Sequence, residues 1–362
     1  MNKILGQPHA LDVLRQALKS ARLHHAWIFS GPRGVGKFTT AVEFAKILLD
    51  PEAAPNLAGA IESDPEGRIS KMIDAESHPD LHVIRKELAL YSDNPLLRAR
   101  KLMNIPIDLL RERMIGGRTG DDKIHDAIAY RTASLGSGKV FIIDEAELID
   151  SNGQNTLLKT LEEPPPRTYM FLITARPERL FATIRSRCQH VRFQPLDHES
   201  MQAWFAQSGL EVDAIEREWI ERFADGAPGQ AKTAAEFGFS QWQLALDPMI
   251  GHLERGGYPS EMGKLMAQLV KDFSEAWVKS RKNASKDAAN KDGARHLLAI
   301  LAAYARRRLH ESANNDEAAS SCADLIDLVR EAERQLETNV NLRHVMDNLV
   351  VQWADLGVPV HA

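Results

Sequence analysis

The sequence predicts an α/β domain built on a five-stranded parallel sheet, followed by a small helical region and an all-helical domain. Three observations predict this fold class. Five short apolar runs alternate with helical stretches in the first 195 residues, and a glycine-rich loop joins the first run to a helix. Beyond Pro195 the apolar residues recur only at three- and four-residue spacing. A chain of 362 residues is long enough for two or three domains.

The predicted strands are mostly apolar without alternation, as expected of strands that helices cover on both faces. They are residues 25–30, 81–85, 139–144, 169–174 and 189–193. We expect helices over residues 38–49, directly after the first strand, and over 155–163, where a run of three prolines stops the helix. Strands that alternate with helices predict a parallel sheet with right-handed crossovers.

The remaining elements are predicted from helical periodicity. We expect a small helical unit over residues 196–240 and helices throughout 241–362, so that residues 1–195 form the first of three domains. The polar stretches 282–293 and 312–321 are typical of loops between helices. Residues 85–104 resemble an inserted loop, and the sequence leaves its role open.

Composition excludes several classes of protein. Apolar residues make up 44% and charged residues 26% of the chain, and the net charge is -5, which is ordinary for a globular protein. No apolar run approaches ~20 residues and the first residues do not resemble a signal peptide, so we expect a cytoplasmic protein without a membrane partner. Two cysteines are too few for a disulfide framework or a cysteine-only zinc site.

The segment SGPRGVGKFTT, residues 30–40, resembles a phosphate-binding loop. Gly31, Gly34, Gly36 and Lys37 have the spacing G-x-x-x-x-G-K, directly after an apolar strand and before a helix. Glycines allow backbone N–H groups to turn toward phosphate oxygens, and the start of the helix adds a positive dipole end. We therefore expect a site for the phosphates of ATP or ADP at this loop.

The next residue departs from that motif. A serine or threonine should follow the lysine and place a hydroxyl on Mg²⁺, whereas this chain has Phe38. Thr39 has a hydroxyl, but it lies one residue further along the helix and points about 100° away. The departure predicts a site that does not hydrolyse ATP and leaves weak nucleotide binding open.

A strand-end acidic pair forms the second candidate feature. Asp144 and Glu145 end the run VFIIDE, where the aspartate would orient Mg²⁺ and the glutamate would polarise an attacking water. Such a pair is also common in ordinary surface turns. Together with the phosphate loop about a hundred residues upstream, it indicates an evolved nucleotide site.

These segments give the chain a family resemblance. With residues 25–37, residues 140–188 and the helical tail, the sequence resembles the bacterial clamp-loader branch of the AAA+ family. The motifs LLKTLEEPP and SRC together are specific for that branch. The resemblance covers about the first 195 residues strongly and is fainter in the tail, where residues 337–353 resemble the last helix of the family's collar domain.

The resemblance implies a P-loop AAA+ core, a helical lid and a helical collar that packs subunits into a five-membered ring. It implies gamma or tau and delta subunits as partners, with the sliding clamp and primed DNA reached through the complex. It also implies a catalytic role in trans for Arg187 of the motif Ser186-Arg187-Cys188, as an arginine finger in a neighbour's ATP site. Thr174, at the end of the fourth strand, takes the place of the family's sensor residue.

The chain departs from the family pattern at two further places, and only the first bears on ATP hydrolysis. Gly229 stands where those relatives carry a lid arginine that senses the γ-phosphate. The four-cysteine zinc module that many relatives carry is absent, and His78 with Asp80 supplies too few ligands for a structural zinc. We therefore expect no required cofactor, no zinc and no intrinsic ATPase. The resemblance implies that nucleotidyl transfer belongs to the DNA polymerase complex as a whole and not to this chain.

Two alternatives remain open from the residues. One is an ATP-hydrolysing motor of the gamma type, which a lid arginine and a hydroxyl at position 38 would have supported. The other is a stand-alone P-loop kinase, which would need its own substrate lid and a complete Mg²⁺ site. Arg185 is interpreted as a structural or phosphate-facing side chain, and Cys188 as a buried packing residue.

Overall fold

The computed structural model describes residues 4–20, 23–55, 61–100, 103–281, 284–312, 315–337 and 340–356. Its contacts divide the chain into two compact units. The first contains residues 1–209 and 226–229, and the second contains 210–225 and 230–362. The division falls inside the region predicted as a lid, so the three-domain organisation stays a prediction.

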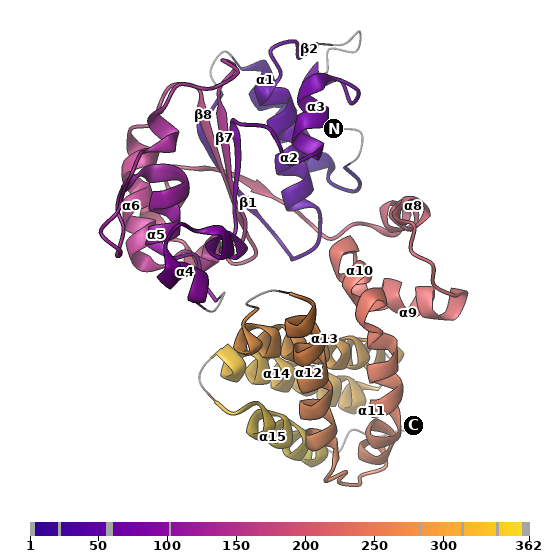
Figure 1. Ribbon diagram of the computed structural model, residues 1–362. Coiled ribbons are helices and arrows are strands. Elements are labelled where there is room, and N and C mark those ends of the chain that lie inside the picture. The colour runs from indigo at the N-terminus through magenta and orange to yellow at the C-terminus, as the bar shows by residue number, and fades with distance from the viewer. Residues whose placement is uncertain are drawn as a thin grey trace. The chain divides into compact units, whose positions relative to one another are not determined.

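The first unit is a five-stranded parallel sheet with helices on both sides (Figure 1). The strand order is β4-β7-β8-β1-β9. These strands are β1 (Ala26–Ser30), β4 (Leu81–Ile84), β7 (Lys139–Ile143), β8 (Thr168–Thr174) and β9 (Gln189–Arg192). They match the five predicted strands to within one residue at each end, so the predicted α/β fold class is confirmed.

Two layers of helices cover the sheet. Helices α2 (Lys37–Leu49) and α3 (Arg68–Asp74) lie on one side, and α5 (Ile107–Leu110) and α6 (Ser151–Glu162) lie on the other (Figure 1). Strands β1 and β7 are buried along their whole length, which explains their unbroken apolar sequence. Asp150 caps α6, because its carboxylate accepts a hydrogen bond from the N–H of Gly153.

The rest of the first unit consists of short elements around the sheet. The stretch predicted as an inserted loop contains a 3₁₀ turn and a short helix, and a buried Glu112 accepts hydrogen bonds from the Ser92 hydroxyl and the Asp93 N–H. These elements are α1 (Pro8–Lys19), β2 (Ala54–Pro55), β3 (Ile61–Glu62), η1 (Lys86–Tyr91), α4 (Pro95–Ala99), η2 (Arg111–Ile115), β5 (Gly117–Arg118), β6 (Ile124–His125), η3 (Ile128–Tyr130), η4 (Ala146–Leu148), η5 (Pro177–Arg179), α7 (Ala182–Arg185) and α8 (His198–Ser208).

The second unit is helical in its described residues. Its helices are α9 (Ala214–Ala224), most of α10 (Pro228–Phe237), α11 (Phe239–Glu254), α12 (Met262–Ser280), α13 (Lys286–Glu311), α14 (Asp316–Glu337) and α15 (Leu342–Asp355). Along the described chain, no helix combines the length and the apolar sequence required to cross a lipid bilayer.

The loop prediction for residues 282–293 was wrong over most of its length. Helix α13 begins at Lys286, where the Ser285 hydroxyl accepts a hydrogen bond from the N–H of Ala288. Ala289 and Gly293 are then buried, and Gly293 lies against the ring of Phe273. Tertiary packing of these small residues outweighs the polar sequence around them. The predicted loop at 312–321 is likewise helical from Asp316 onward.

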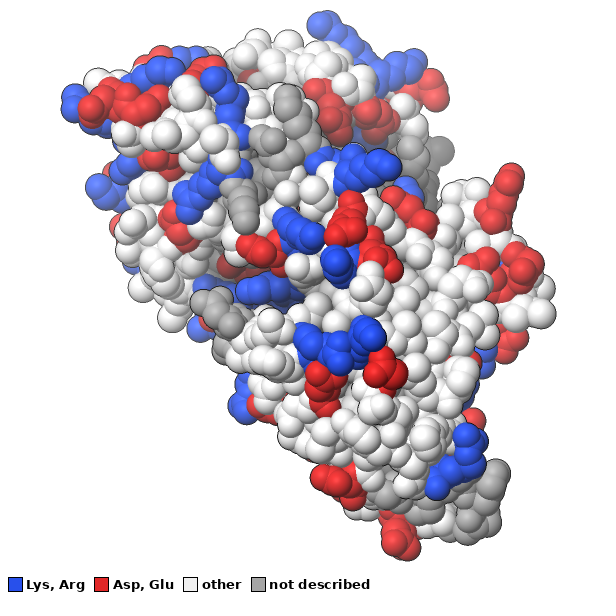
Figure 2. Space-filling view, turned by 60° about the horizontal axis from the view of Figure 1, so that its bottom comes forward, with Lys and Arg blue, Asp and Glu red and all other residues white. Residues whose placement is uncertain are grey.

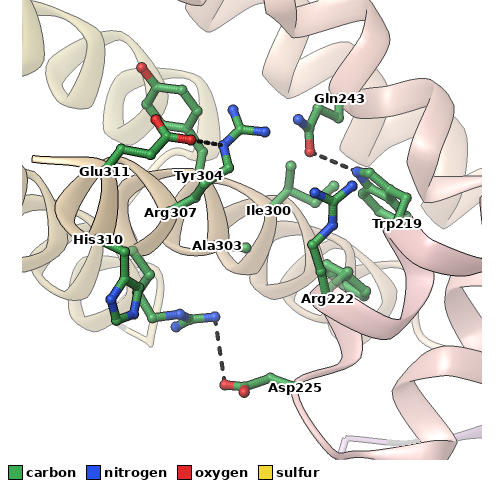
Figure 3. A pocket seen from close by; sticks show the side chains of 12 residues that line it. Trp219, Arg222, Asp225, Gln243, Ile300, Ala303, Tyr304, Arg307, His310 and Glu311 are labelled. Carbon is green, nitrogen blue, oxygen red and sulfur yellow. Dashed lines mark hydrogen bonds and ion pairs between the residues drawn. The ribbon is translucent and has the colours of Figure 1, made fainter. Parts of the chain in front are cut away.

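A cavity of about 440 Å³ lies in the second unit between α9, α11 and α13 (Figure 3). Trp219 and Phe223 line the cavity and stack on each other, and the indole N–H of Trp219 donates to Gln243. At its rim Arg306 lies 3.8 Å from Asp225, a separation too long for a hydrogen bond. Such an exposed ion pair contributes little to stability. The Trp219 hydrogen bond and the edge-to-face contact of Phe223 with Phe239 join α9 to α11.

Charges of both signs are dispersed over one face of the molecule (Figure 2). The face drawn in Figure 2 shows lysines and arginines next to aspartates and glutamates, separated by wide uncharged areas. Such a surface agrees with the modest net charge of -5.

Candidate functional site

The phosphate loop follows β1 at the carboxyl edge of the sheet. Gly31, Gly34 and Gly36 have positive φ angles of 144°, 80° and 98°. A Cβ on Gly31 would lie 2.3 Å from the carbonyl oxygen of Phe193, whereas a Cβ on Gly36 would meet no atom within 4 Å. The turn therefore requires glycine at position 31, and open space lies beside Gly36 at the start of α2.

Lys37 turns its side chain into its own loop. Its Nζ donates to the carbonyl oxygen of Gly31 at 2.7 Å and also to that of Pro32. The residue is only 6% exposed, and this burial lowers the pKa of Lys37 to about 8, against the opposing charges of Glu147 and Asp144. The ammonium group thus binds loop carbonyls in the position from which it would contact a phosphate.

Phe38 and Asp144 both contact the same arginine, Arg85. The guanidinium carbon of Arg85 lies 4.1 Å from the centre of the Phe38 ring, a cation–π arrangement. Its Nε lies 3.4 Å from Oδ2 of Asp144. Burial raises the pKa of Asp144, and the charge of Arg85 opposes that rise. Arg85 therefore lies between the residue that lacks the hydroxyl and the carboxylate that would orient Mg²⁺.

Glu145 also has partners from within the chain. Its Oε1 lies 3.1 Å from Arg33 of the phosphate loop, and its Oε2 accepts a hydrogen bond of 2.6 Å from Lys86. The backbone of Glu145 is left-handed, with φ of 51°, a conformation that non-glycine residues seldom adopt. Both carboxylate oxygens are thus engaged by cations of this chain.

The other predicted residues of this site divide into two groups. Thr174 is buried at the end of β8, paired in register with Ser30, and its hydroxyl accepts a hydrogen bond from the N–H of Arg176. It lies on β8, between the strands that precede the phosphate loop and the acidic pair. Thr39 is exposed, while the neighbouring Thr40 hydroxyl donates to the carbonyl of Gly36, so neither replaces the missing magnesium ligand.

Gly229 packs directly on the phosphate loop. Its N–H donates to the carbonyl oxygen of Gly34 at 2.9 Å. A Cβ at position 229 would lie 2.7 Å from the Cα of Gly34, closer than real Cβ contacts allow. No side chain fits there unless the loop moves.

These contacts test which groups the site fits. The glycine turn, the lysine and the open space beside Gly36 fit a phosphate group. The acidic pair does not fit Mg²⁺, because Phe38 offers no ligand oxygen and a guanidinium already pairs with Asp144. No catalytic step of hydrolysis follows from this arrangement.

Arg187 lies at the amino ends of the strands, opposite the carboxyl ends where the phosphate loop lies. It precedes β9, whose first residue Gln189 pairs with Trp27 near the start of β1, whereas the phosphate loop follows the end of β1. At about 3.3 Å per residue the two sites are separated by roughly the length of a strand. The guanidinium donates to the carbonyl of Thr183 and pairs with Glu162 at 2.7 Å.

The residues around Arg187 are structural. Cys188 is buried, and this burial raises the pKa of its thiol to about 12, so the thiol is a poor nucleophile and its interpretation as a packing residue holds. Glu162, at the end of α6, is 51% exposed on its side chain, and Arg187 is 36% exposed. The ion pair of Arg187 with Glu162 is therefore largely exposed to solvent and contributes little to stability.

His78 and Asp80 serve the fold. The carboxylate of Asp80 accepts hydrogen bonds from the N–H groups of Ser134 and Leu135, and Nδ1 of His78 accepts one from the N–H of Asp80. Among the described residues no group of three histidine, cysteine, aspartate or glutamate side chains is arranged to hold a metal ion. That the chain needs no zinc stays a prediction.

Sequence reasoning missed the cations that pair with the acidic residues. Arg85 and Lys86 directly follow β4, and β4 pairs with β7 in the register Ile84↔Ile143. Residues that follow neighbouring parallel strands meet at one edge of the sheet, so the basic pair after one strand lies beside the acidic pair after the other. The basic dipeptide Arg85-Lys86 and the acidic dipeptide Asp144-Glu145 were visible in the sequence, but their pairing could be inferred only from the strand order.

The first unit matches a known protein family. The model of the family described as DNA polymerase III, delta subunit, matches residues 6–197, more than half of the chain. The chain belongs to this family. The predicted resemblance to the clamp-loader branch is confirmed. Within that branch, a 31% identical relative is the DNA polymerase III subunit delta' of Bacillus subtilis, matched over 202 residues.

Other relatives of this family member are longer proteins. The DNA polymerase III subunit gamma/tau of Mycobacterium tuberculosis is 30% identical over 230 residues, which are 62% of this chain and 35% of that protein. The match to the Bacillus relative covers 56% of this chain and 51% of that protein, so the chain spans about half the length of that relative. A gamma subunit-related protein of known structure from Thermotoga maritima is 15% identical over 96% of this chain and 99% of that one, with a TM-score of 0.37, too low to add to the argument.

Proposed function

We propose that this chain is a delta-prime-type subunit of a bacterial replicative clamp loader, located in the cytoplasm. It assembles with gamma or tau and delta subunits into the ring that loads the sliding clamp onto primed DNA. The chain hydrolyses no ATP itself. It acts as a stator and presents Arg187 to the ATP site of a neighbouring subunit.

The position of Arg187 carries the proposal. The arginine lies at the amino edge of the sheet, while the chain's own phosphate loop lies at the carboxyl edge. An arginine that stabilises a phosphoryl group from this edge must therefore act on another subunit. Arginine fingers supplied in this way accelerate phosphoryl transfer by on the order of 10³–10⁵.

The arrangement of the chain's own site supports the stator role. Phe38 supplies no magnesium ligand, Asp144 pairs with Arg85, and Gly229 leaves no room for a sensing arginine. These features weigh against the gamma-type motor, although gamma/tau proteins are among the relatives at 30% identity. Membership of the DNA polymerase III delta subunit family weighs against a stand-alone kinase.

The experiment is the DNA-stimulated ATPase rate of a loader reconstituted with Arg187→Ala in place of the wild-type chain. Arg185→Ala is the matched control, because Arg185 lies two residues away in the same turn. We expect the loader to assemble in both cases and only Arg187→Ala to lose most of the turnover of one site. If both variants kept the ATPase rate of the wild-type loader, the chain would be a scaffold that supplies no arginine finger.

A further inference from the structure

Phe38 and Arg85 both distinguish this site from one that hydrolyses ATP, and their side chains contact each other. Phe38 removes a magnesium ligand, and its ring supports the guanidinium of Arg85 at 4.1 Å. An aromatic face stabilises a cation more strongly when the cation is partly removed from water, and the Arg85 side chain is 40% exposed. The substitution that disfavours a metal ion thus favours an arginine at the same place.

Nearby positive charge stabilises the two carboxylates of the acidic pair, Asp144 and Glu145. Asp144 is 25% exposed on its side chain, and burial raises its pKa, which means that the carboxylate is costly without a cation nearby. Arg85 supplies that charge at 3.4 Å. Arg33 and Lys86 supply it to Glu145 from the phosphate loop and from the turn after β4.

We infer that Arg85 takes the place of Mg²⁺ in this chain, so that the former nucleotide site is built to be stable without a metal ion. The inference rests on the proposed function only in treating the phosphate loop as a retired nucleotide site. A divalent cation at Asp144 would meet the guanidinium at close range, and like charges at such a distance repel. Any polyphosphate at this loop is therefore held in its metal-free form, by the loop and by arginine and lysine side chains.

The test uses Mn²⁺ as a paramagnetic probe, titrated into the full chain with and without ADP and followed by the signal of free Mn²⁺. ADP alone binds Mn²⁺, so each signal is compared with that of the same solution without protein, and we expect the wild-type chain to leave it unchanged. Phe38→Thr combined with Arg85→Ala restores a hydroxyl and removes the charge, and should tighten Mn²⁺ binding by at least about tenfold, which is about 1.4 kcal/mol. The added Asp144→Asn should abolish that gain.

The matched control keeps the positive charge. Phe38→Thr combined with Arg85→Lys has the same hydroxyl but retains a cation near Asp144, so it should bind Mn²⁺ no better than the wild-type chain. Circular dichroism and the thermal transition show whether each variant is folded. Mn²⁺ binding by the wild-type chain that Asp144→Asn abolishes would overturn the inference, and so would a folded Phe38→Thr, Arg85→Ala variant that gains no Mn²⁺ affinity.

A variant that fails to fold does not leave the inference untested. Thermal unfolding of Arg85→Met, Asp144→Asn and the combined variant then measures the coupling of the pair, and we expect the combined variant to melt higher than Arg85→Met alone because no carboxylate is left uncompensated. Additive shifts would contradict the inference. All these readings use the isolated chain, so they fail independently of the ATPase test on Arg187.

Discussion

The basic side chains at the phosphate loop and at the Ser186–Cys188 turn differ in their burial and in their partners. At the loop, Lys37 is 6% exposed and binds carbonyls of its own turn, and Arg85 lies between a ring and a carboxylate. At the turn, Arg187 is 36% exposed and rests on an exposed glutamate. One edge of the sheet uses its positive charge internally, and the other keeps an arginine that a partner can engage at small cost.

The largest effect expected from this comparison concerns the buried charge of Lys37. Its folded-state pKa of about 8 lies below the unfolded value of 10.5. Between these values the unfolded chain binds more protons, so the contribution of Lys37 to stability rises with pH by up to about 3 kcal/mol. Below about pH 8 both states are protonated and the contribution is constant.

Lys37→Met removes this titration. We expect the free energy of unfolding of the wild-type chain to rise relative to that of Lys37→Met as pH increases from about 8 to about 10, with a constant difference at lower pH. Urea unfolding of both chains across this range measures it. A difference that stays flat throughout would show that Lys37 is solvated and that the loop is open.

A smaller effect concerns the close approach of Gly229 to the loop. Gly229→Ala places a Cβ about 2.7 Å from the Cα of Gly34, so we expect a loss of about 2 kcal/mol in the free energy of unfolding. Gly251→Ala in α11 is the control, because its Cβ meets nothing closer than 3.4 Å and alanine favours a helix. If Gly229→Ala matches the control, the phosphate loop moves easily and is packed less tightly than its contacts indicate.

The sequence predicted what depends on local pattern. The five strands, the glycine loop and the unsuitable Phe38 follow from apolar runs and a spaced motif, and the structure has them where they were expected. It did not predict that Arg85 contacts Phe38 and Asp144, because these residues are far apart in the chain. The pairing of β4 with β7 brings Arg85 beside Asp144, and Phe38 comes from α2. It also missed the start of α13, where buried small residues form a helix within a polar stretch.

The contact of Gly229 with Gly34 was equally beyond local reasoning. The sequence indicated that glycine stands where the family carries an arginine, but not that a Cβ at this position would lie 2.7 Å from the Cα of Gly34. The ion pair of Arg187 with Glu162 joins the ends of two helices and depends on how α6 and α7 pack. Sequence patterns thus located both candidate sites, and tertiary packing decided what their charges contact.

The most direct measurement compares the two edges of the sheet within one assembly. The ATPase rate of the reconstituted loader is measured with the wild-type chain, with Lys37→Met and with Arg187→Ala, after gel filtration has shown that each ring is assembled. The account predicts an unchanged rate for Lys37→Met and the loss of most of one site's turnover for Arg187→Ala. The opposite pattern, with Lys37→Met slow and Arg187→Ala unaffected, would show that the chain uses its own nucleotide site, and would contradict the account.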